Sequence, residues 1–254
     1  MSKLDDLISE LCPNGVKYKT LGEISSLITK GTTPTSVGYS FQKEGVSFVK
    51  IESITNDGAF LKEKFEHISN ECNKKLNRSI LKENDILFSI AGALGRIAVV
   101  TKDILPANTN QALALIRLED NDINVKYIFY VLQTTKIKGQ FESQQTGSAQ
   151  SNLSLRNISD LLVPLPPLPV QHEIVHILDD FTQRTKELIA ELAAELTARK
   201  QQYEYYRNVL LTFDNLEAHN FTDRQTDRQT DRQTDRQTDR QTDRQTDRSM
   251  ADIR

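Results

Sequence analysis

The sequence predicts an α+β protein in which a mixed α/β domain is followed by one long coiled-coil-type helix and a disordered repeat tail. Three observations carry this prediction. Short apolar runs alternate with turn residues over the first 160 positions. Neither Gly nor Pro occurs at positions 170–213, as expected for an uninterrupted helix. From Thr222 onward the chain is almost wholly a four-residue polar repeat, which cannot fold around a core.

The expected division of the chain is residues 1–165 for the domain, 166–215 for a proline junction and the helix, and 216–254 for the tail. Without the last 33 residues, about 221 remain, which is enough for one large core or two small ones.

No stretch approaches the roughly 20 apolar residues of a membrane span, and the acidic start lacks the basic lead of a signal peptide. Cys12 and Cys72 have neither metal-ligand spacing nor a disulfide framework around them, as in a reducing compartment. We expect a soluble cytoplasmic protein that does not contact a membrane.

The first segment shows strand and helix patterns. Apolar or alternating runs bounded by Gly, Asn, Asp and Pro predict strands at residues 46–51, 85–90, 96–100 and 111–116. Helical spacing of Tyr127, Ile128, Val131 and Leu132 predicts a helix over residues 125–135. Ser154 is a favourable N-cap for a second helix over residues 155–162.

A proline-rich run, Val163-Pro-Leu-Pro-Pro-Leu-Pro169, separates this segment from the long helix. Proline fixes φ and removes a backbone donor, so the run should be extended and stiff and should form the domain boundary. The helix after it spans about 40 residues, or roughly 60 Å at 1.5 Å per residue. The apolar residues from Ile174 to Leu192 recur at spacings of 3, 4 and 7. The pattern then shifts by four residues and continues from Leu196. They form the expected dimerisation stripe, which consists of Ile174, Leu178, Phe181, Leu188, Leu192, Leu196, Tyr203 and Leu210.

A helix with one apolar stripe needs a partner helix or surface to cover that stripe. Packing of the whole helix on its own domain is the simpler alternative. However, a helix of roughly 60 Å outreaches a 160-residue domain, whose radius of gyration should be about 15 Å. Pairing between chains, or with a missing second half of the molecule, is therefore favoured.

One short motif, His172-Glu-Ile-Val-His176, has the spacing of a zinc-binding helix in which Glu polarises a metal-bound water. A metal site also needs a third ligand and a cleft. Glu191 and Glu195 lie 15 and 19 residues beyond His176, or about 22 to 28 Å along the helix. We therefore favour solvent-facing histidines and predict neither a metal site nor a catalytic residue in this chain.

Several loops carry polar groups suited to DNA. Gly92-Ala-Leu-Gly-Arg96 lacks the phosphate-loop patterns and is expected to be a tight turn that presents backbone N–H groups and Arg96. Lys30-Gly-Thr-Thr-Pro34 and residues 146–152 add a cation, hydroxyls and amides.

Residues 1–160 carry 19 Lys and Arg against 18 Asp and Glu, and the whole chain has net charge −3. Any nucleic-acid role must therefore come from a local patch. The expected DNA-binding residues are Lys30, Thr32, Thr33, Lys50, Arg96, Gln111, Ser148 and Gln150.

A further set of residues resembles a junction in the specificity subunits of type I restriction–modification enzymes, where a target-recognition domain meets a conserved helix. The set consists of Leu165-Pro-Pro-Leu-Pro-Val-Gln171, Ile174-Val175 and Ile177-Leu-Asp-Asp-Phe181. The helix end at residues 199–207 and 210–213 is similar too. The resemblance covers residues 16–213 and extends to further landmarks of the recognition domain, which are Leu21-Gly-Glu23, Gly31-Thr-Thr-Pro34, Asp85-Ile-Leu-Phe-Ser89, Gly95-Arg96, Asn110-Gln111 and Gly147-Ser148.

This resemblance implies a non-catalytic subunit that reads double-stranded DNA and holds modification (methyltransferase) and restriction subunits. S-adenosylmethionine and ATP would be bound by those partners, and no cofactor is expected in this chain. The family usually has two recognition domains and two long antiparallel helices, whereas this chain has one of each. We therefore expect a homodimer that reads a split inverted repeat, because a two-fold axis presents the same half-site in opposite orientation. A coiled-coil scaffold whose globular head binds protein, and a metal hydrolase using His172 and His176, remain alternatives.

The tail contains seven copies of Thr-Asp-Arg, six of them followed by Gln. Like charges at i and i+4 disfavour a helix here, so disorder is expected. In the genetic code, the codon series ACA-GAC-AGA-CAG specifies Thr-Asp-Arg-Gln and is also three copies of the tetranucleotide ACAG, so we expect the repeat to be encoded in this way. Gain or loss of one tetranucleotide would shift the frame without changing the repeated residues, which predicts phase variation in which a second half lies downstream in another frame. An in-frame linker with mixed codons is the alternative.

Overall fold

The computed structural model describes residues 2–119, 122–143 and 152–212. The chain divides into two compact units, one of residues 7–175 and one of residues 1–6 with 176–254. The expected tail at 216–254 lies outside the described residues. No described helix is long and apolar enough to cross a membrane.

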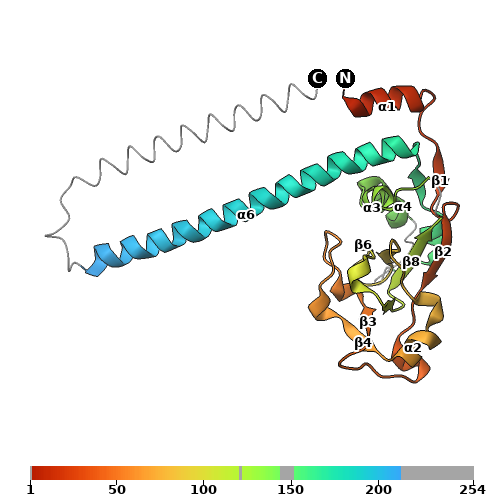
Figure 1. Cartoon of the computed structure of the whole chain (residues 1–254), viewed down its shortest axis with the longest axis horizontal. Coiled ribbons are helices and arrows are strands. Elements are labelled where there is room, and N and C mark those ends of the chain that lie inside the picture. Colours follow the sequence, from red (N-terminus) through yellow and green to blue (C-terminus); the bar gives the residue numbers. More distant parts are fainter. Residues whose placement is uncertain (1, 120–121, 144–151, 213–254) are drawn as a thin grey trace. The chain divides into compact units, whose positions relative to one another are not determined.

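Three sheets organise the 7–175 unit (Figure 1). The largest has the antiparallel order β2-β8-β5-β6, and the second has the order β4-β3-β7, in which β3 and β7 are parallel. A short pair joins β1 to β9. The bounds are β1 Tyr18–Thr20, β2 Ser25–Lys30, β3 Val46–Val49, β4 Glu66–Ile68, β5 Ile86–Ser89, β6 Ile97–Val99, β7 Ala107–Thr109, β8 Leu113–Leu118 and β9 Leu162–Pro164.

Six α-helices are described: α1 Lys3–Leu11, α2 Asn70–Lys75, α3 Val125–Leu132, α4 Thr135–Ser143, α5 Leu155–Ser159 and α6 Leu168–Thr212. Together with the sheets they confirm the expected α+β class with one long helix. The four expected strand runs correspond to β3, β5, β6 and β8, the last of which continues two residues beyond the predicted end at 116.

Strand β5 of the four-stranded sheet is buried on both faces, and its successive side chains point alternately to the two sides of the sheet. Ile86 and Phe88 of β5 point into a core that includes residues of α3, α4 and α5. Leu87, between them, points into a second core shared with the three-stranded sheet. All three side chains are fully buried. This sheet is therefore the central layer that fixes where the strand ends lie.

Two predicted helices end earlier than expected. The helix from residue 125 stops at Leu132, and α4 starts separately at Thr135. The helix capped by Ser154 stops at Ser159 rather than at residue 162. It stops because Leu162–Pro164 pairs with Tyr18–Thr20 as strand β9, a long-range pairing that overrides the local helical pattern.

The proline junction is held by two buried side chains. Gln171 is fully buried, and its amide donates to the carbonyls of Asp122 at 3.0 Å and Pro166 at 2.8 Å. The amide oxygen of Gln171 accepts from the Asn124 N–H at 2.9 Å. The Tyr127 hydroxyl donates to the Pro164 carbonyl at 3.0 Å. The proline run stays extended only as far as residue 167, and α6 begins at Leu168, two residues before the expected start. Pro169 is tolerated in the first turn because an N–H at that position has no partner within the helix.

Tyr127 gives this junction a pH dependence. Burial raises the pKa of Tyr127 to about 12 from its ordinary value of 10.0. The unfolded chain therefore loses this proton at a lower pH than the folded chain, so the free energy of unfolding should fall as pH rises from about 10 to about 12. Urea unfolding of the Tyr127→Phe variant, measured at pH 9 and pH 11, should show a smaller fall than the parent. An equal fall in both proteins would assign the effect to other groups.

Helix α6 spans 45 residues and appears as one uninterrupted helix in Figure 1, which confirms the expected long helix. Ile174 packs against the core of the 7–175 unit. From Phe181 onward, the large apolar side chains of the stripe are exposed. The exposed fractions are 61% for Phe181, 55% for Leu188, 55% for Leu192, 56% for Leu196, 66% for Tyr203 and 55% for Leu210.

Candidate nucleic-acid interface

The carboxyl ends of β2, β3 and β7 meet at one edge of the 7–175 unit, which we call the polar edge. It comprises residues 30–33, 49–54, 66, 96 and 109–111. The hydroxyl of Thr109, at the end of β7, donates to the carbonyl of Val49, at the end of β3, at 2.9 Å. The Gly31 N–H, just after β2, donates to the Asn110 carbonyl at 3.1 Å. Segments that lie about 60 or 80 positions apart in the sequence are thereby joined.

Gly31 permits the closest of these approaches. A Cβ atom at this position would lie 1.8 Å from the Thr109 carbonyl oxygen, well inside van der Waals contact. Only glycine lets the two backbones come so near. The glycine of the Lys30-Gly-Thr-Thr-Pro34 loop is thus required by the packing of the polar edge.

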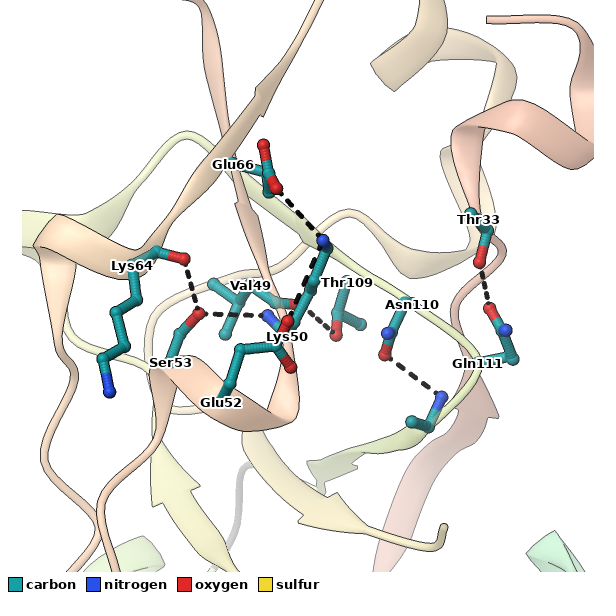
Figure 2. A network of polar contacts seen from close by, with 11 residues as sticks. Thr33, Val49, Lys50, Glu52, Ser53, Lys64, Glu66, Thr109, Asn110 and Gln111 are labelled. Carbon is teal, nitrogen blue, oxygen red and sulfur yellow. Dashed lines mark hydrogen bonds and ion pairs between the residues drawn. The ribbon is translucent and has the colours of Figure 1, made fainter. Parts of the chain in front are cut away.

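Six of the residues expected to bind DNA lie on this edge, namely Lys30, Thr32, Thr33, Lys50, Arg96 and Gln111. Lys30 is exposed and forms no ion pair within the described part of the chain, and Thr32 is half-buried. The Thr33 hydroxyl donates to the Gln111 amide oxygen, which joins the loop after β2 to the loop before β8 (Figure 2). Lys50 follows β3 directly. The edge therefore presents a cation, a hydroxyl and an amide that come from separate parts of the sequence.

Lys50, which was expected to bind DNA, is in contact with acidic and aromatic groups of the protein. Its ammonium lies 3.2 Å from the Glu66 carboxylate and 3.8 Å from that of Glu52 (Figure 2). It also lies 4.6 Å from the centre of the Phe41 ring, within the range of a cation–π contact. The side chain is 21% exposed. Its charge is therefore engaged by protein groups, and a direct contact from Lys50 to a phosphate is not what this geometry favours.

Arg96 also serves the protein backbone. One of its terminal nitrogens donates to the carbonyls of Ile51 at 3.3 Å and Ile54 at 3.0 Å. Its Nε is buried without a hydrogen-bond partner among the described residues. The expected tight turn is confirmed: Gly92 and Gly95 have φ of 72° and 77°, in the left-handed region that favours glycine. Arg96 thus fixes the turn after β3 instead of extending toward solvent.

Ser148 and Gln150 lie outside the described residues. The fold brings Glu52, Glu66 and Asn110 to the same edge. None of them was among the expected DNA-binding residues, although Asn110 was one of the landmarks of the family resemblance. Asn110 has a weak local signal, because it stands beside Gln111 in a polar break between two strands. Glu52 and Glu66 have none, since each resembles an ordinary exposed acid until β3 pairs with β4.

The His172-Glu-Ile-Val-His176 motif lies near the start of α6. His172 and His176 are both exposed, as expected for solvent-facing residues. No group of three or more His, Cys, Asp or Glu residues able to hold a metal was found in the described ranges.

An α+β domain whose strand ends converge on a polar edge, joined to a long helix, defines a recognition module more than an enzyme cleft. Residues 13–198 match the family model described as the type I restriction modification DNA specificity domain. The chain belongs to that family, as its resemblance to type I specificity subunits indicated.

Individual relatives agree with this assignment. The chain is 30% identical over 226 residues to the specificity subunit of the type I restriction enzyme EcoprrI from Escherichia coli, covering 86% of this chain and 55% of that protein. It is 45% identical over 161 residues to a putative type I restriction enzyme specificity subunit from Haemophilus influenzae, covering 61% of this chain and 40% of the relative.

Solved structures show the same fold. The crystal structure of an HsdS subunit from Thermoanaerobacter tengcongensis matches with a TM-score of 0.59 at 20% identity, over 82% of this chain and 52% of that one. A structure concerning complex assembly of the type I R-M system matches with a TM-score of 0.56 at 23% identity, over 75% of this chain and 45% of that one. The chain spans about half the length of the first curated relatives it matches.

Proposed function

We propose that this chain is the sequence-specific DNA-recognition subunit of a type I restriction–modification complex and performs no catalysis itself. The observation that carries the proposal is the convergence of Lys30, Thr33 and Gln111 on one edge of a chain in this family. Its partners would be double-stranded DNA, a methyltransferase subunit and a restriction subunit, in the cytoplasm. S-adenosylmethionine and ATP would bind to those partner subunits.

The chemistry of the polar edge supports this function. An exposed lysine contributes affinity by neutralising phosphates and releasing counterions. Amides and hydroxyls can hydrogen-bond to base edges in the major groove, and Gln can pair with adenine through two bonds. The expected DNA-binding residues include three cations, of which Lys50 and Arg96 already contact groups of the protein. Lys30 is therefore the main candidate for a phosphate contact in the described part of the edge.

Replacing Lys30 with Ala should therefore weaken DNA binding about tenfold, or about 1.4 kcal/mol. The slope of log affinity against log salt should become less steep by about one, because one phosphate contact is lost. The duplex to use carries the motif found by sequencing methylated sites in cells that express the chain. Titrations at several salt concentrations measure both quantities.

Lys82→Ala is the matched control. Lys82 is also exposed, but it precedes β5, and the pairing of Ile86 with Ile116 and of Ser89 with Leu113 places it at the opposite end of the sheet from Gln111. Its removal should leave the salt slope unchanged. Equal effects of the two substitutions would contradict a specific role for the polar edge.

We further infer that the chain acts as a half-subunit that forms a homodimer, with residues 1–165 as the recognition domain, 166–215 as junction and dimerisation helix, and 216–254 as the repeat tail. Two observations support this inference: the chain spans about half of its relatives, and the stripe on α6 is exposed from Phe181 to Leu210. Ile174 already packs on its own unit, so we assign the dimer seam to the stripe residues beyond it. Such a dimer would read a split inverted repeat, and an asymmetric methylated motif from this chain alone would contradict it.

The exposed stripe also fits a coiled-coil scaffold whose globular head binds protein. Sequence-specific, salt-dependent DNA binding by the full chain would decide against the scaffold. A chain that dimerises but binds no duplex DNA, with or without the methyltransferase subunit, would favour it.

A further inference from the structure

The segment that follows β3 holds an exposed carboxylate in a fixed position on the polar edge. Glu52 lies in a single turn of 3₁₀ helix, Ile51–Ser53. The Ser53 side chain is fully buried, and its hydroxyl donates to the Lys64 carbonyl at 3.1 Å. Arg96 donates to the carbonyl of Ile51 from the other side. The backbone on both sides of Glu52 is therefore anchored to other parts of the domain.

The Glu52 side chain is 55% exposed. Its carboxylate lies 3.8 Å from the Lys50 ammonium, while Glu66 makes the closer contact with that ammonium at 3.2 Å. Figure 2 shows Lys50 between the two carboxylates. Lys50 thus partly neutralises Glu52 and leaves most of its acceptor capacity open to solvent.

A carboxylate at a DNA interface has a specific use. It is repelled by phosphates, so it is disfavoured unless a nearby cation offsets its charge. An ionised carboxylate only accepts hydrogen bonds. In the major groove, guanine and thymine present acceptors, and adenine presents an acceptor beside its amine. Cytosine presents its N4 amine as a donor without an adjacent acceptor of its own, so it is the base that a carboxylate favours.

We propose that Glu52 is a specificity-determining residue that accepts a hydrogen bond from the N4 amine of a cytosine in the major groove. Lys50 is its positioning residue, holding and partly neutralising the carboxylate while Glu66 and Phe41 hold Lys50. This proposal rests on the proposed DNA-recognition function. It gives an indirect role to Lys50, which the sequence placed among the expected DNA-binding residues.

The test is selection of bound duplexes from a randomised DNA pool by the full chain in complex with its methyltransferase subunit. The parent should enrich a motif with cytosine at one position. Glu52→Gln should reduce the preference for cytosine at that position about tenfold, because an amide can also donate to acceptor bases. The other positions of the motif should keep their preferences. Glu83→Gln removes the same charge from an exposed residue before β5, at the far end of the sheet, and should leave the motif unchanged.

The role of Lys50 is tested with two further variants. Lys50→Met should lower the preference at the same single position, and Lys50→Arg should restore it, since the charge and not merely the packing is needed. Circular dichroism melting would confirm that each variant folds. If Lys50→Met and Lys50→Arg give the same motif, the positioning role is overturned.

The remaining outcomes separate this inference from the proposed function. If the parent selects a motif and Glu52→Gln selects the same motif with the same preferences, the inference is overturned and DNA recognition stands. If Glu52→Gln changes a position at which the parent prefers another base, the assignment to cytosine is overturned. If the parent enriches no motif, the DNA-recognition function itself fails.

Discussion

Replacing both Leu188 and Leu192 with Glu should abolish the proposed homodimer and leave a monomer. Both side chains belong to the apolar stripe of α6, and each is 55% exposed in the single chain. If the stripe pairs with a copy of itself, the substitution places four carboxylates in one apolar seam. Burying an unpaired charge costs several kcal/mol, so the pairing should be lost. Sedimentation equilibrium at micromolar concentration measures the change in mass.

The control for this experiment is Ala190→Glu with Ala194→Glu. These residues are also four apart and exposed, and at 100° per residue they lie on the opposite side of α6 from the stripe. They add the same charge and should leave the dimer intact. The two leucines lie outside the 7–175 unit, so that unit should stay folded in both variants. Recruitment of the methyltransferase subunit should fail only in the leucine variant. A monomeric parent protein would contradict the homodimer.

Removing the carboxylate of Asp85 should destabilise the 7–175 unit by about 3 kcal/mol or more. Asp85 is 1% exposed and forms two bonds of 2.7 Å with the Arg117 guanidinium. It also accepts from the Lys82 N–H at 2.7 Å. Arg117 is itself only 25% exposed. Asp85→Ala therefore leaves a largely buried guanidinium without its counter-charge, which is costlier than losing the pair as a whole.

Urea unfolding followed by circular dichroism measures this loss. Asp103→Ala provides the comparison, because Asp103 pairs with Lys62 at 2.6 Å while both side chains are more than half exposed. A solvent-exposed pair contributes little, so this variant should unfold close to the parent. If the two variants lost the same stability, the burial of the Asp85–Arg117 pair would not be the cause.

The sequence by itself determined the elements whose signals are local. The alternation of Ile86, Leu87 and Phe88 between two cores follows from the period of two in a strand. The absence of Gly and Pro from 170–213 predicted α6, which was found at Leu168–Thr212. The proline run and Gln171 carried the family resemblance, and the structure gives the buried Gln171 side chain three hydrogen bonds at that junction.

Only the tertiary structure decided how the candidate site is assembled. The loops with Lys30, Thr33 and Gln111 were visible in the sequence, but their convergence depends on Gly31 reaching Asn110 across the ends of β2 and β7. Lys50 and Arg96 were expected to bind DNA. In the structure, Lys50 pairs with Glu66, 16 positions away, and Arg96 donates to the Ile51 carbonyl, 45 positions away. Local patterns report propensity and periodicity, whereas a side chain's partner is set by which strands pair. The parallel pairing of β3 with β7 joins residues 60 positions apart, and no short-range signal specifies it.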